Sequence, residues 1–219
     1  MIVVFDSGIG GKTLVTNIKK KLPSERVVFV SDSEHCPYGE KSVAQIRKLV
    51  LARLKKHLDQ NPAIVVIACN TATVAAIDWL RKEYPNIKFV GMVPALKPAV
   101  AFSKTKTIAV LATPLTVKSN KYKQLIQQFT KGFKVYSIGA KGLAKAIENS
   151  DKKLVDRLLK RYLSPLKQRK VDVIVLGCTH YLLVKSAIQD MMGKGVILVD
   201  SNEAVVNRVN YLIQLSHGS

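Results

Sequence analysis

The sequence predicts an α/β protein of two pseudo-symmetric domains, each a parallel β-sheet flanked by helices, with the functional site in the cleft between them. Three observations support this prediction. Short apolar runs rich in β-branched residues alternate with amphipathic stretches along the 219 residues. The runs are continuously apolar, as expected of parallel strands that are covered on both faces. Finally, the eight runs fall into two sets of four.

The predicted strands are short, rich in Val and Ile, and bounded by turn or polar residues. In chain order they are Ile2–Phe5, Val27–Ser31, Ile64–Ala68, Phe89–Met92, Ile108–Leu111, Val135–Ile138, Val173–Leu176 and Val196–Val199.

The predicted helices are the longer amphipathic stretches between these strands. In chain order they are Gly11–Lys21, Ser42–Leu58, Ala72–Tyr84, Ala95–Ala101, Thr116–Phe129, Lys152–Leu163, Leu182–Met192 and Glu203–Leu215.

The two sets of strands repeat at a nearly constant offset. Asp6 ends the first strand and Thr113 follows the fifth, 107 residues later, while Cys69 and Cys178 follow the third and seventh strands, 109 residues apart. We expect a first domain of residues 1–93 plus 200–219 and a second domain of residues 94–199. The last helix then returns to the first domain.

Composition narrows the class of protein. The chain has 35 Lys and Arg against 15 Asp and Glu, a net charge of +20, which favours contact with polyanions. The basic residues are scattered and no nucleic-acid-binding motif accompanies them, so we interpret them as a solvated surface open to non-specific polyanion contact. No apolar run is long enough to span a membrane, and no basic leader precedes the first strand. Three widely spaced cysteines indicate reduced thiols and a cytoplasmic location.

The stretch FDSGIGGKT near the start of the chain partly matches a phosphate-binding loop. Gly11, Lys12 and Thr13 supply the end of that pattern, but Asp6 stands where its first glycine belongs. A carboxylate there opposes an anionic ligand. Either the loop is a damaged nucleotide site or the aspartate is itself functional.

Two thiols stand at equivalent strand ends, where ligand sites form in open α/β sheets. Cys69 and Cys178 each precede a predicted helix N-terminus, whose partial positive charge favours the thiolate. Two thiols in mirrored positions suggest that one removes a proton from a carbon while the other delivers a proton to the opposite face. Other interpretations stay open: Cys69 as a buried apolar residue, Asp6, Asn70 and Thr71 as helix caps, and Cys178 with His180 as metal ligands, although no further ligands are evident. Cys36 lies on a loop without a symmetric partner, and we expect no chemistry from it.

Seven stretches in order resemble the cofactor-independent aspartate/glutamate racemase superfamily, and within it the glutamate racemases. They are DSGIGG from Asp6, PYG from Pro37, ACNTA from Ala68, VPALKPA from Val93, LATPLT from Leu111, LGCTHY from Leu176 and DS at Asp200. They cover nearly the whole chain. The resemblance implies that Asp6 is functional and that the phosphate-loop likeness is accidental.

The resemblance also implies roles for individual residues. Cys69 and Cys178 are the expected acid/base thiols, Asp6 assists Cys69, and His180 assists Cys178. Glu148 is the expected partner of His180, although the sequence around it diverges from the family. The residues expected to hold the substrate are Asp6, Ser7, Pro37, Tyr38, Gly39, Asn70, Thr71, Thr113, Thr116, Cys178, Thr179 and His180.

The implied activity is interconversion of L- and D-glutamate without a metal or other cofactor, supplying D-glutamate for peptidoglycan; a homodimer is one expected assembly. Aspartate is the alternative substrate, but aspartate enzymes tend to carry His after CNTA, where this chain has Thr73. Two alternatives come from other classes. One is an NTPase using Gly11–Thr13 and Asp200, and the other is a polyanion-binding protein on a racemase fold.

Overall fold

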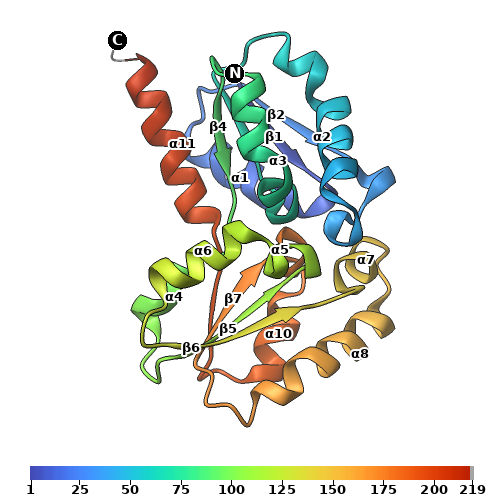
Figure 1. Cartoon of the computed structure of the whole chain (residues 1–219), viewed down its shortest axis with the longest axis vertical. Coiled ribbons are helices and arrows are strands. Elements are labelled where there is room, and N and C mark those ends of the chain that lie inside the picture. Colours follow the sequence, from blue (N-terminus) through green and yellow to red (C-terminus); the bar gives the residue numbers. More distant parts are fainter. Residues whose placement is uncertain (218–219) are drawn as a thin grey trace.

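The computed structural model, which describes residues 1–217, contains two four-stranded parallel sheets (Figure 1). Their strand orders are β2-β1-β3-β4 and β6-β5-β7-β8, so the second sheet repeats the order of the first. The strands are β1 Ile2–Asp6, β2 Val27–Ser31, β3 Ile64–Ile67, β4 Lys88–Gly91, β5 Thr107–Ala112, β6 Lys134–Gly139, β7 Val173–Gly177 and β8 Ile197–Val199. The predicted fold class is confirmed.

Helices cover both faces of the first sheet. Alternate residues of β1 point to opposite faces, with Ile2 and Val4 on one side and Val3 and Phe5 on the other. The face of Ile2 packs against α1 (Lys12–Lys21) and α11 (Asn202–His217), and the other face against α2 (Val43–Leu58) and α3 (Asn70–Glu83). Because both faces are buried, the strands read as unbroken apolar runs in the sequence.

The second sheet is covered in the same way. One face packs against α4 (Leu96–Phe102) and α6 (Asn120–Phe129). The other face packs against α7 (Leu143–Glu148), α8 (Lys152–Leu163) and α10 (Lys185–Met192). The remaining short elements are α5 Pro114–Lys118, α9 Thr179–Leu182, and the 3₁₀ turns η1 Ile9–Gly11, η2 Ser33–His35, η3 Tyr38–Glu40 and η4 Ser164–Leu166.

Two predicted helices were wrong as single elements. The stretch Thr116–Phe129 is interrupted at Ser119, whose extended backbone (φ −68°, ψ 147°) ends α5 and whose hydroxyl accepts a hydrogen bond from the Tyr122 N–H to cap α6. The stretch Leu182–Met192 is divided between α9 and α10. The sequence prediction also missed α7, a six-residue helix that follows Gly142 in the left-handed region (φ 79°).

The chain crosses from one sheet to the other between β4 and β5, and returns after β8. Helix α11 then packs against α1 and the first sheet (Figure 1). The domain bounds of 1–93 plus 200–219 and 94–199 stay a prediction, and residues 218 and 219 lie outside the described part of the chain. Among residues 1–217 no helix has the length and apolarity needed to cross a membrane.

The sheet topology places the functional residues. In each sheet the chain changes direction between its two central strands, β1 and β3 in the first and β5 and β7 in the second. Ligand sites form at such switch points, outside the carboxyl ends of the strands. A hydrogen bond between the hydroxyls of Thr71 and Thr113, and one donated by Thr179 to Asp6, join the two sets of strand ends.

Candidate active site

Cys69 lies between β3 and α3 and caps that helix. Its Sγ accepts hydrogen bonds from the Ala72 N–H, at 3.4 Å, and from the Ser7 hydroxyl, at 3.3 Å. The side chain is only 6% exposed. Ser7 follows β1, the strand beside β3, so the sheet itself brings the hydroxyl to the thiol.

The expectation that the helix N-terminus lowers the pKa of this thiol was wrong for Cys69. Burial raises its pKa from 9.0 to about 12, and the nearby Asp6 carboxylate adds to the rise. The hydrogen bonds from Ser7 and Ala72 oppose the rise without cancelling it. A cationic group beside the sulfur, such as the ammonium of an amino acid, would favour the thiolate.

Asp6 ends β1 and is fully buried. One carboxylate oxygen accepts from the Gly8 N–H and the other accepts from the Thr179 hydroxyl, both at 2.9 Å. Burial raises its pKa from 3.8 to about 6, against the opposing effects of His180 and of these two hydrogen bonds. Asp6 therefore acts on Cys69 through its charge, while its direct partner is a residue of the second half.

Cys178 lies between β7 and α9 in the equivalent place. Its Sγ is 3.9 Å from His180 Nδ1, a long contact, and His180 Nε2 is 2.5 Å from Glu148 Oε2. The same glutamate oxygen accepts from the Ile9 N–H at 3.2 Å. The structure thus brings together the predicted trio of Cys178, His180 and Glu148.

The charges of His180 and Glu148 support each other. Burial disfavours the imidazolium of His180, but hydrogen bonds with Cys178, Cys36 and Glu148 outweigh it and raise its pKa. Burial also disfavours the Glu148 carboxylate, but hydrogen bonds from His180 and Ile9 hold its pKa below the ordinary value. His180 and Glu148 therefore form a buried ion pair behind the Cys178 thiol.

Three buried threonines form a hydroxyl cluster across the two halves. Thr71 Oγ1 is 2.9 Å from Thr113 Oγ1 and 3.4 Å from Thr116 Oγ1, and the latter two are 3.0 Å apart. Gly39 lies against them, because a Cβ at that position would be 2.7 Å from the Cβ of Thr113. These four residues are among the predicted substrate contacts, and the structure brings them together.

Asn70 is the first residue of α3, directly after Cys69. Its side-chain amide is buried, and neither its oxygen nor its nitrogen has a hydrogen-bond partner within the described residues. An unsatisfied buried amide is rare and calls for an explanation. Its place beside the thiol fits the prediction that Asn70 contacts a bound ligand.

Tyr38 is held by a carboxylate of its own half, and its predicted contact with substrate stays a prediction. Its hydroxyl donates to Asp32 Oδ2 at 2.7 Å, and burial together with this carboxylate raises its pKa. Asp32 also accepts from His35 Nδ1 and from the guanidinium of Arg53. Asp32, which follows β2 just as Asp6 ends β1, was not singled out from the sequence. Pro37, which follows Cys36 through a cis peptide, introduces the Tyr38 turn.

The loop that resembles a phosphate site binds protein carboxylates instead. The Gly8 and Ile9 N–H groups donate to Asp6 and Glu148, so these backbone donors are already occupied by anions. A Cβ at Gly11 would be 2.6 Å from the Cβ of Asp6. The loop is therefore a packed part of the thiol site, which disfavours the NTPase alternative.

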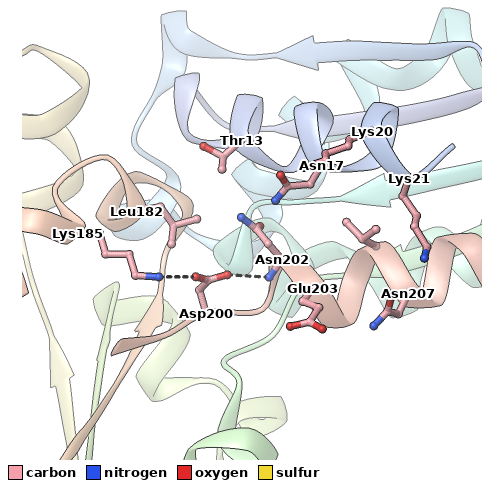
Figure 2. A pocket seen from close by; sticks show the side chains of 11 residues that line it. Thr13, Asn17, Lys20, Lys21, Leu182, Lys185, Asp200, Asn202, Glu203 and Asn207 are labelled. Carbon is pink, nitrogen blue, oxygen red and sulfur yellow. Dashed lines mark hydrogen bonds and ion pairs between the residues drawn. The ribbon is translucent and has the colours of Figure 1, made fainter. Parts of the chain in front are cut away.

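A separate cavity of about 650 Å³ lies between α1, α11 and the α9–α10 segment (Figure 2). Its lysines include Lys20, Lys21 and Lys185, and the last pairs with Asp200 at 3.3 Å. Asp200 also accepts from the Asn202 N–H. Neither thiol lines this cavity, so it is distinct from the acid/base site.

The comparisons with known proteins agree with this geometry. Residues 12–209 match the family model described as Asp/Glu/Hydantoin racemase. The chain is 40% identical to glutamate racemase of Shewanella denitrificans, covering 97% of this chain and 78% of that relative. It is 38% identical to glutamate racemase of Ectopseudomonas mendocina, covering 96% of this chain and 81% of that relative.

Solved structures give the same result. Glutamate racemase RacE1 of Bacillus anthracis has a TM-score of 0.86 at 33% identity, covering 99% of this chain and 82% of that one. The Escherichia coli glutamate racemase, solved with L-glutamate and the activator UDP-MurNAc-ala, has a TM-score of 0.86 at 34% identity, covering 97% and 82%. Aspartate racemase of Picrophilus torridus, at 16% identity and a TM-score of 0.69 over 99% and 94%, shares the fold alone. Two thiols on repeated sheets, a matching family model and these relatives together show that the chain belongs to the Asp/Glu/Hydantoin racemase family.

Proposed function

We propose that this chain interconverts L- and D-glutamate by proton transfer at Cα, using Cys69 and Cys178 and no cofactor, and so supplies D-glutamate for peptidoglycan. One observation carries the proposal: the two buried thiols follow equivalent strands, β3 and β7, of two sheets with the same strand order. The glutamate racemases to which the chain is 36–40% identical support the choice of reaction.

In this mechanism one thiolate removes the Cα proton and the other thiol donates a proton to the opposite face of the carbon. The electron pair left by the first transfer forms the new C–H bond in the second, so the configuration inverts and the enzyme's protons balance. Cys69 works with Ser7 and the charge of Asp6, and Cys178 works with the His180–Glu148 ion pair. The roles of the two thiols exchange when the opposite enantiomer binds.

Neutral donors are proposed to hold the substrate. The hydroxyls of Thr71, Thr113 and Thr116 and the unpartnered amide of Asn70 face no arginine or lysine in the described hydrogen bonds. Preorganised neutral donors in a site closed to water stabilise the charge that develops on the α-carboxylate as the proton leaves. The α-ammonium of the substrate lowers the pKa of Cys69 toward the working range.

Exchange of the Cα hydrogen with solvent tests the two-thiol mechanism. In D₂O, early product should carry deuterium at Cα while remaining substrate keeps its original hydrogen, in both directions, because the donating thiol has exchanged with solvent. Cys69→Ala and Cys178→Ala should each abolish racemisation, since inversion needs both a base and an acid.

Single-face chemistry provides the control for these variants. Each should still abstract a proton from a substrate with a β leaving group on the face of its surviving thiol, releasing the leaving group with its electron pair. Full racemase activity in either variant would overturn the mechanism, as would early product that retains the original hydrogen.

Glutamate is preferred over aspartate on the strength of the relatives. The chain is 31% identical to the Francisella tularensis glutamate racemase solved with D-glutamate, whereas its likeness to the aspartate racemase reaches the fold only. The Thr73 hydroxyl is bonded to the backbone of Ile67 and Met92, and its link to the choice of glutamate stays a prediction. Circular dichroism assays with both amino acids decide the question, and faster turnover of aspartate would overturn this part of the proposal.

We further propose a cytoplasmic protein that makes weak, non-specific polyanion contacts and forms a homodimer. The three free cysteines support a reducing location, and the net charge of +20 supports the polyanion contact. Exposed Phe102, Tyr211 and Leu215 are candidate dimer contacts. Light scattering of the purified protein measures the assembly.

A further inference from the structure

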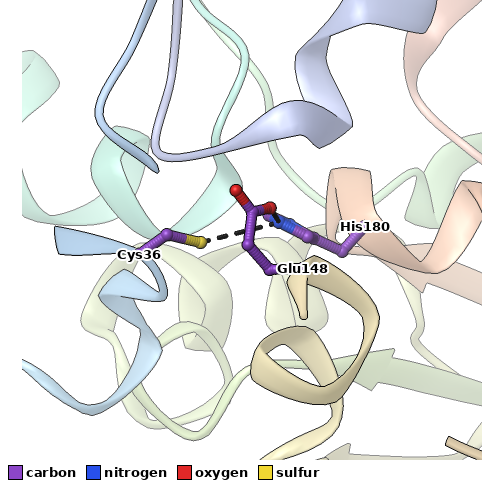
Figure 3. Close-up of side chains that lie close together, drawn as sticks. All are labelled: Cys36, Glu148 and His180. Carbon is purple, nitrogen blue, oxygen red and sulfur yellow. Dashed lines mark hydrogen bonds and ion pairs between the residues drawn. The ribbon is translucent and has the colours of Figure 1, made fainter. Parts of the chain in front are cut away.

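Three metal-ligating side chains meet beside the Cys178 half of the site (Figure 3). Cys36 comes from the loop between η2 and η3, Glu148 from α7, and His180 from α9. Cys36 Sγ is 3.6 Å from His180 Nε2, and Glu148 Oε2 is 2.5 Å from the same nitrogen. The three ligand atoms all lie within 4.8 Å of one another.

These distances fit a tetrahedral metal with a small adjustment. With Zn–S of about 2.3 Å and Zn–N of about 2.0 Å, tetrahedral angles place sulfur and nitrogen about 3.5 Å apart. The Cys36–His180 pair, at 3.6 Å, is already close to this separation. The Glu148–His180 hydrogen bond, at 2.5 Å, is too short to span a metal, so the carboxylate must move until its oxygen lies about 3.4 Å from Nε2.

The surroundings also favour a cation. Glu148 and the buried Asp6 both act on Cys36 with their negative charge, although the chain as a whole is strongly positive. The backbone of Gly8 covers one side of the cluster, since a Cβ there would be 2.5 Å from Glu148 Oε2 and 2.9 Å from Cys36 Sγ. The three ligands are therefore partly enclosed by protein.

We propose that Cys36, Glu148 and His180 form a reversible inhibitory site for a thiophilic divalent metal such as Zn²⁺. Binding replaces the Cys36 thiol proton and the His180 Nε2 proton, which leave to solvent, and a water completes the coordination. The metal would bind His180 Nε2, the nitrogen that is now hydrogen-bonded to Glu148, so His180 could not remain the imidazolium behind Cys178. That the metal inhibits rests on the proposed racemase function; that it binds does not.

The site also joins the two halves of the protein. Cys36 lies with the first sheet, while Glu148 and His180 lie with the second. A metal bound to all three would hold the halves together, so substrate exchange would slow along with the chemistry. The metal is an inhibitor here and no requirement for activity, so chelators should preserve turnover.

Cobalt provides a readout that does not depend on activity. Adding Co²⁺ to the reduced protein should produce a near-ultraviolet thiolate-to-metal charge-transfer band at one ion per chain, and Cys36→Ala should remove it. His35→Ala is the matched control: His35 belongs to a neighbouring cluster with Asp32 and Glu34, where Arg53 already supplies the positive charge. That variant should keep the band.

Zinc inhibition forms the second arm, measured for each variant against its own metal-free rate. Cys36→Ala should raise the Zn²⁺ concentration for half inhibition at least tenfold, as expected when a ligand is lost, since even outer partners of metal sites cost about 10–100-fold. His35→Ala should leave it unchanged. An unchanged cobalt band in Cys36→Ala would assign the metal to Cys69 or Cys178 and overturn the site, whatever the amino-acid activity proves to be.

Discussion

Asp6 joins the two halves of the molecule through a single carboxylate. It ends a strand of the first sheet, yet it accepts a hydrogen bond from Thr179 of the second half. The burial that allows this contact also disfavours its charge and raises its pKa to about 6. Glu148 is the counterpart, because it belongs to the second half and accepts from the Ile9 N–H of the first. Each half thus supplies an acid whose donor comes from the other half.

The raised pKa of Asp6 predicts a specific pH dependence of stability. Its folded pKa of about 6 exceeds the ordinary value of 3.8, so its contribution is fully present below pH 4 and is lost as the pH rises through 6. The loss is on the order of 3 kcal/mol. In urea unfolding, Asp6→Asn should remove this part of the decline, so that its stability relative to wild type improves from pH 4 to pH 7.

Asp32→Asn is the control of opposite sign. Hydrogen bonds from Tyr38, His35 and Arg53 outweigh burial and lower the pKa of Asp32, so its contribution is present above its ordinary pKa and is lost as the pH falls. That variant should lose more stability at pH 7 than at low pH. Parallel pH profiles for wild type and Asp6→Asn would contradict the assignment.

Glu148→Gln should remove the ion pair behind His180 while keeping a hydrogen-bonding group of the same shape. Because the two enantiomers have equal free energy, kcat/KM must fall by the same factor in both directions, by about tenfold or more. A difference between the two reaction directions should appear in kcat and in the Cα deuterium isotope effect. The isotope effect should grow in the direction that uses Cys178 as base.

Glu40→Gln is the matched control for this variant, since Glu40 lies at the surface, 4.0 Å from Lys141. Its kinetics should match those of the wild type. If Glu148→Gln left both directions unchanged and Glu40→Gln did not, the role of partner to His180 would move to Glu40.

At the level of the secondary structure, the strand-to-helix junctions carry the site. The Tyr38–Glu40 turn packs against α5, and Gly39 lies within van der Waals reach of Thr113 only because it lacks a Cβ. This close approach lets the turn of the first half cover the hydroxyl cluster of Thr71, Thr113 and Thr116. Small residues at such junctions are required by the contact between halves and not by the conformation of the turn.

Gly39→Ala should therefore impair binding more than folding. The added methyl displaces Thr113 and disturbs the hydroxyl cluster, at a cost of about 1–3 kcal/mol, so KM for glutamate should rise about tenfold or more. Gly195→Ala is the control, because a Cβ there meets nothing within 4 Å. Equal KM values for the two variants would contradict the role of the cluster in holding substrate.

Short apolar runs were sufficient to predict the strands, because the central strands β1, β3, β5 and β7 are buried throughout and the edge strands keep an apolar segment. Periodicity could not predict α7, whose six residues are too few to display a helical repeat, and so Glu148 was placed by resemblance alone. Asp32 was not singled out from the sequence, and Cys36 was expected to take no part in the chemistry. Their contacts, of Asp32 with Arg53 of α2 and of Cys36 with His180 of the other half, depend on how the loop after β2 folds, which no local pattern encodes.

For the whole molecule, the net charge of +20 belongs to a fold whose buried candidate site contains neutral hydroxyls, carboxylates and the ion pair His180–Glu148. We therefore expect the positive surface charge to act on polyanions without involving the buried thiol site. Any DNA binding should be weak, independent of sequence, and should fall steeply between about 50 and about 200 mM salt. Fluorescence anisotropy with two duplexes of unrelated sequence measures this, and tight selective binding to one of them at physiological salt would contradict it.

The crossed hydrogen bonds of Asp6 and Glu148 exist only while the two halves of the molecule are in contact. Any separation of the two halves would break the Asp6–Thr179 and Glu148–Ile9 hydrogen bonds, so each carboxylate would lose a contact that lowers its pKa. The contact between the halves that would shut out bulk water therefore also completes the hydrogen bonding of both carboxylates. A carbanion formed between the joined halves would be shielded from bulk water. An amino acid that meets separated halves would find both carboxylates without these hydrogen bonds.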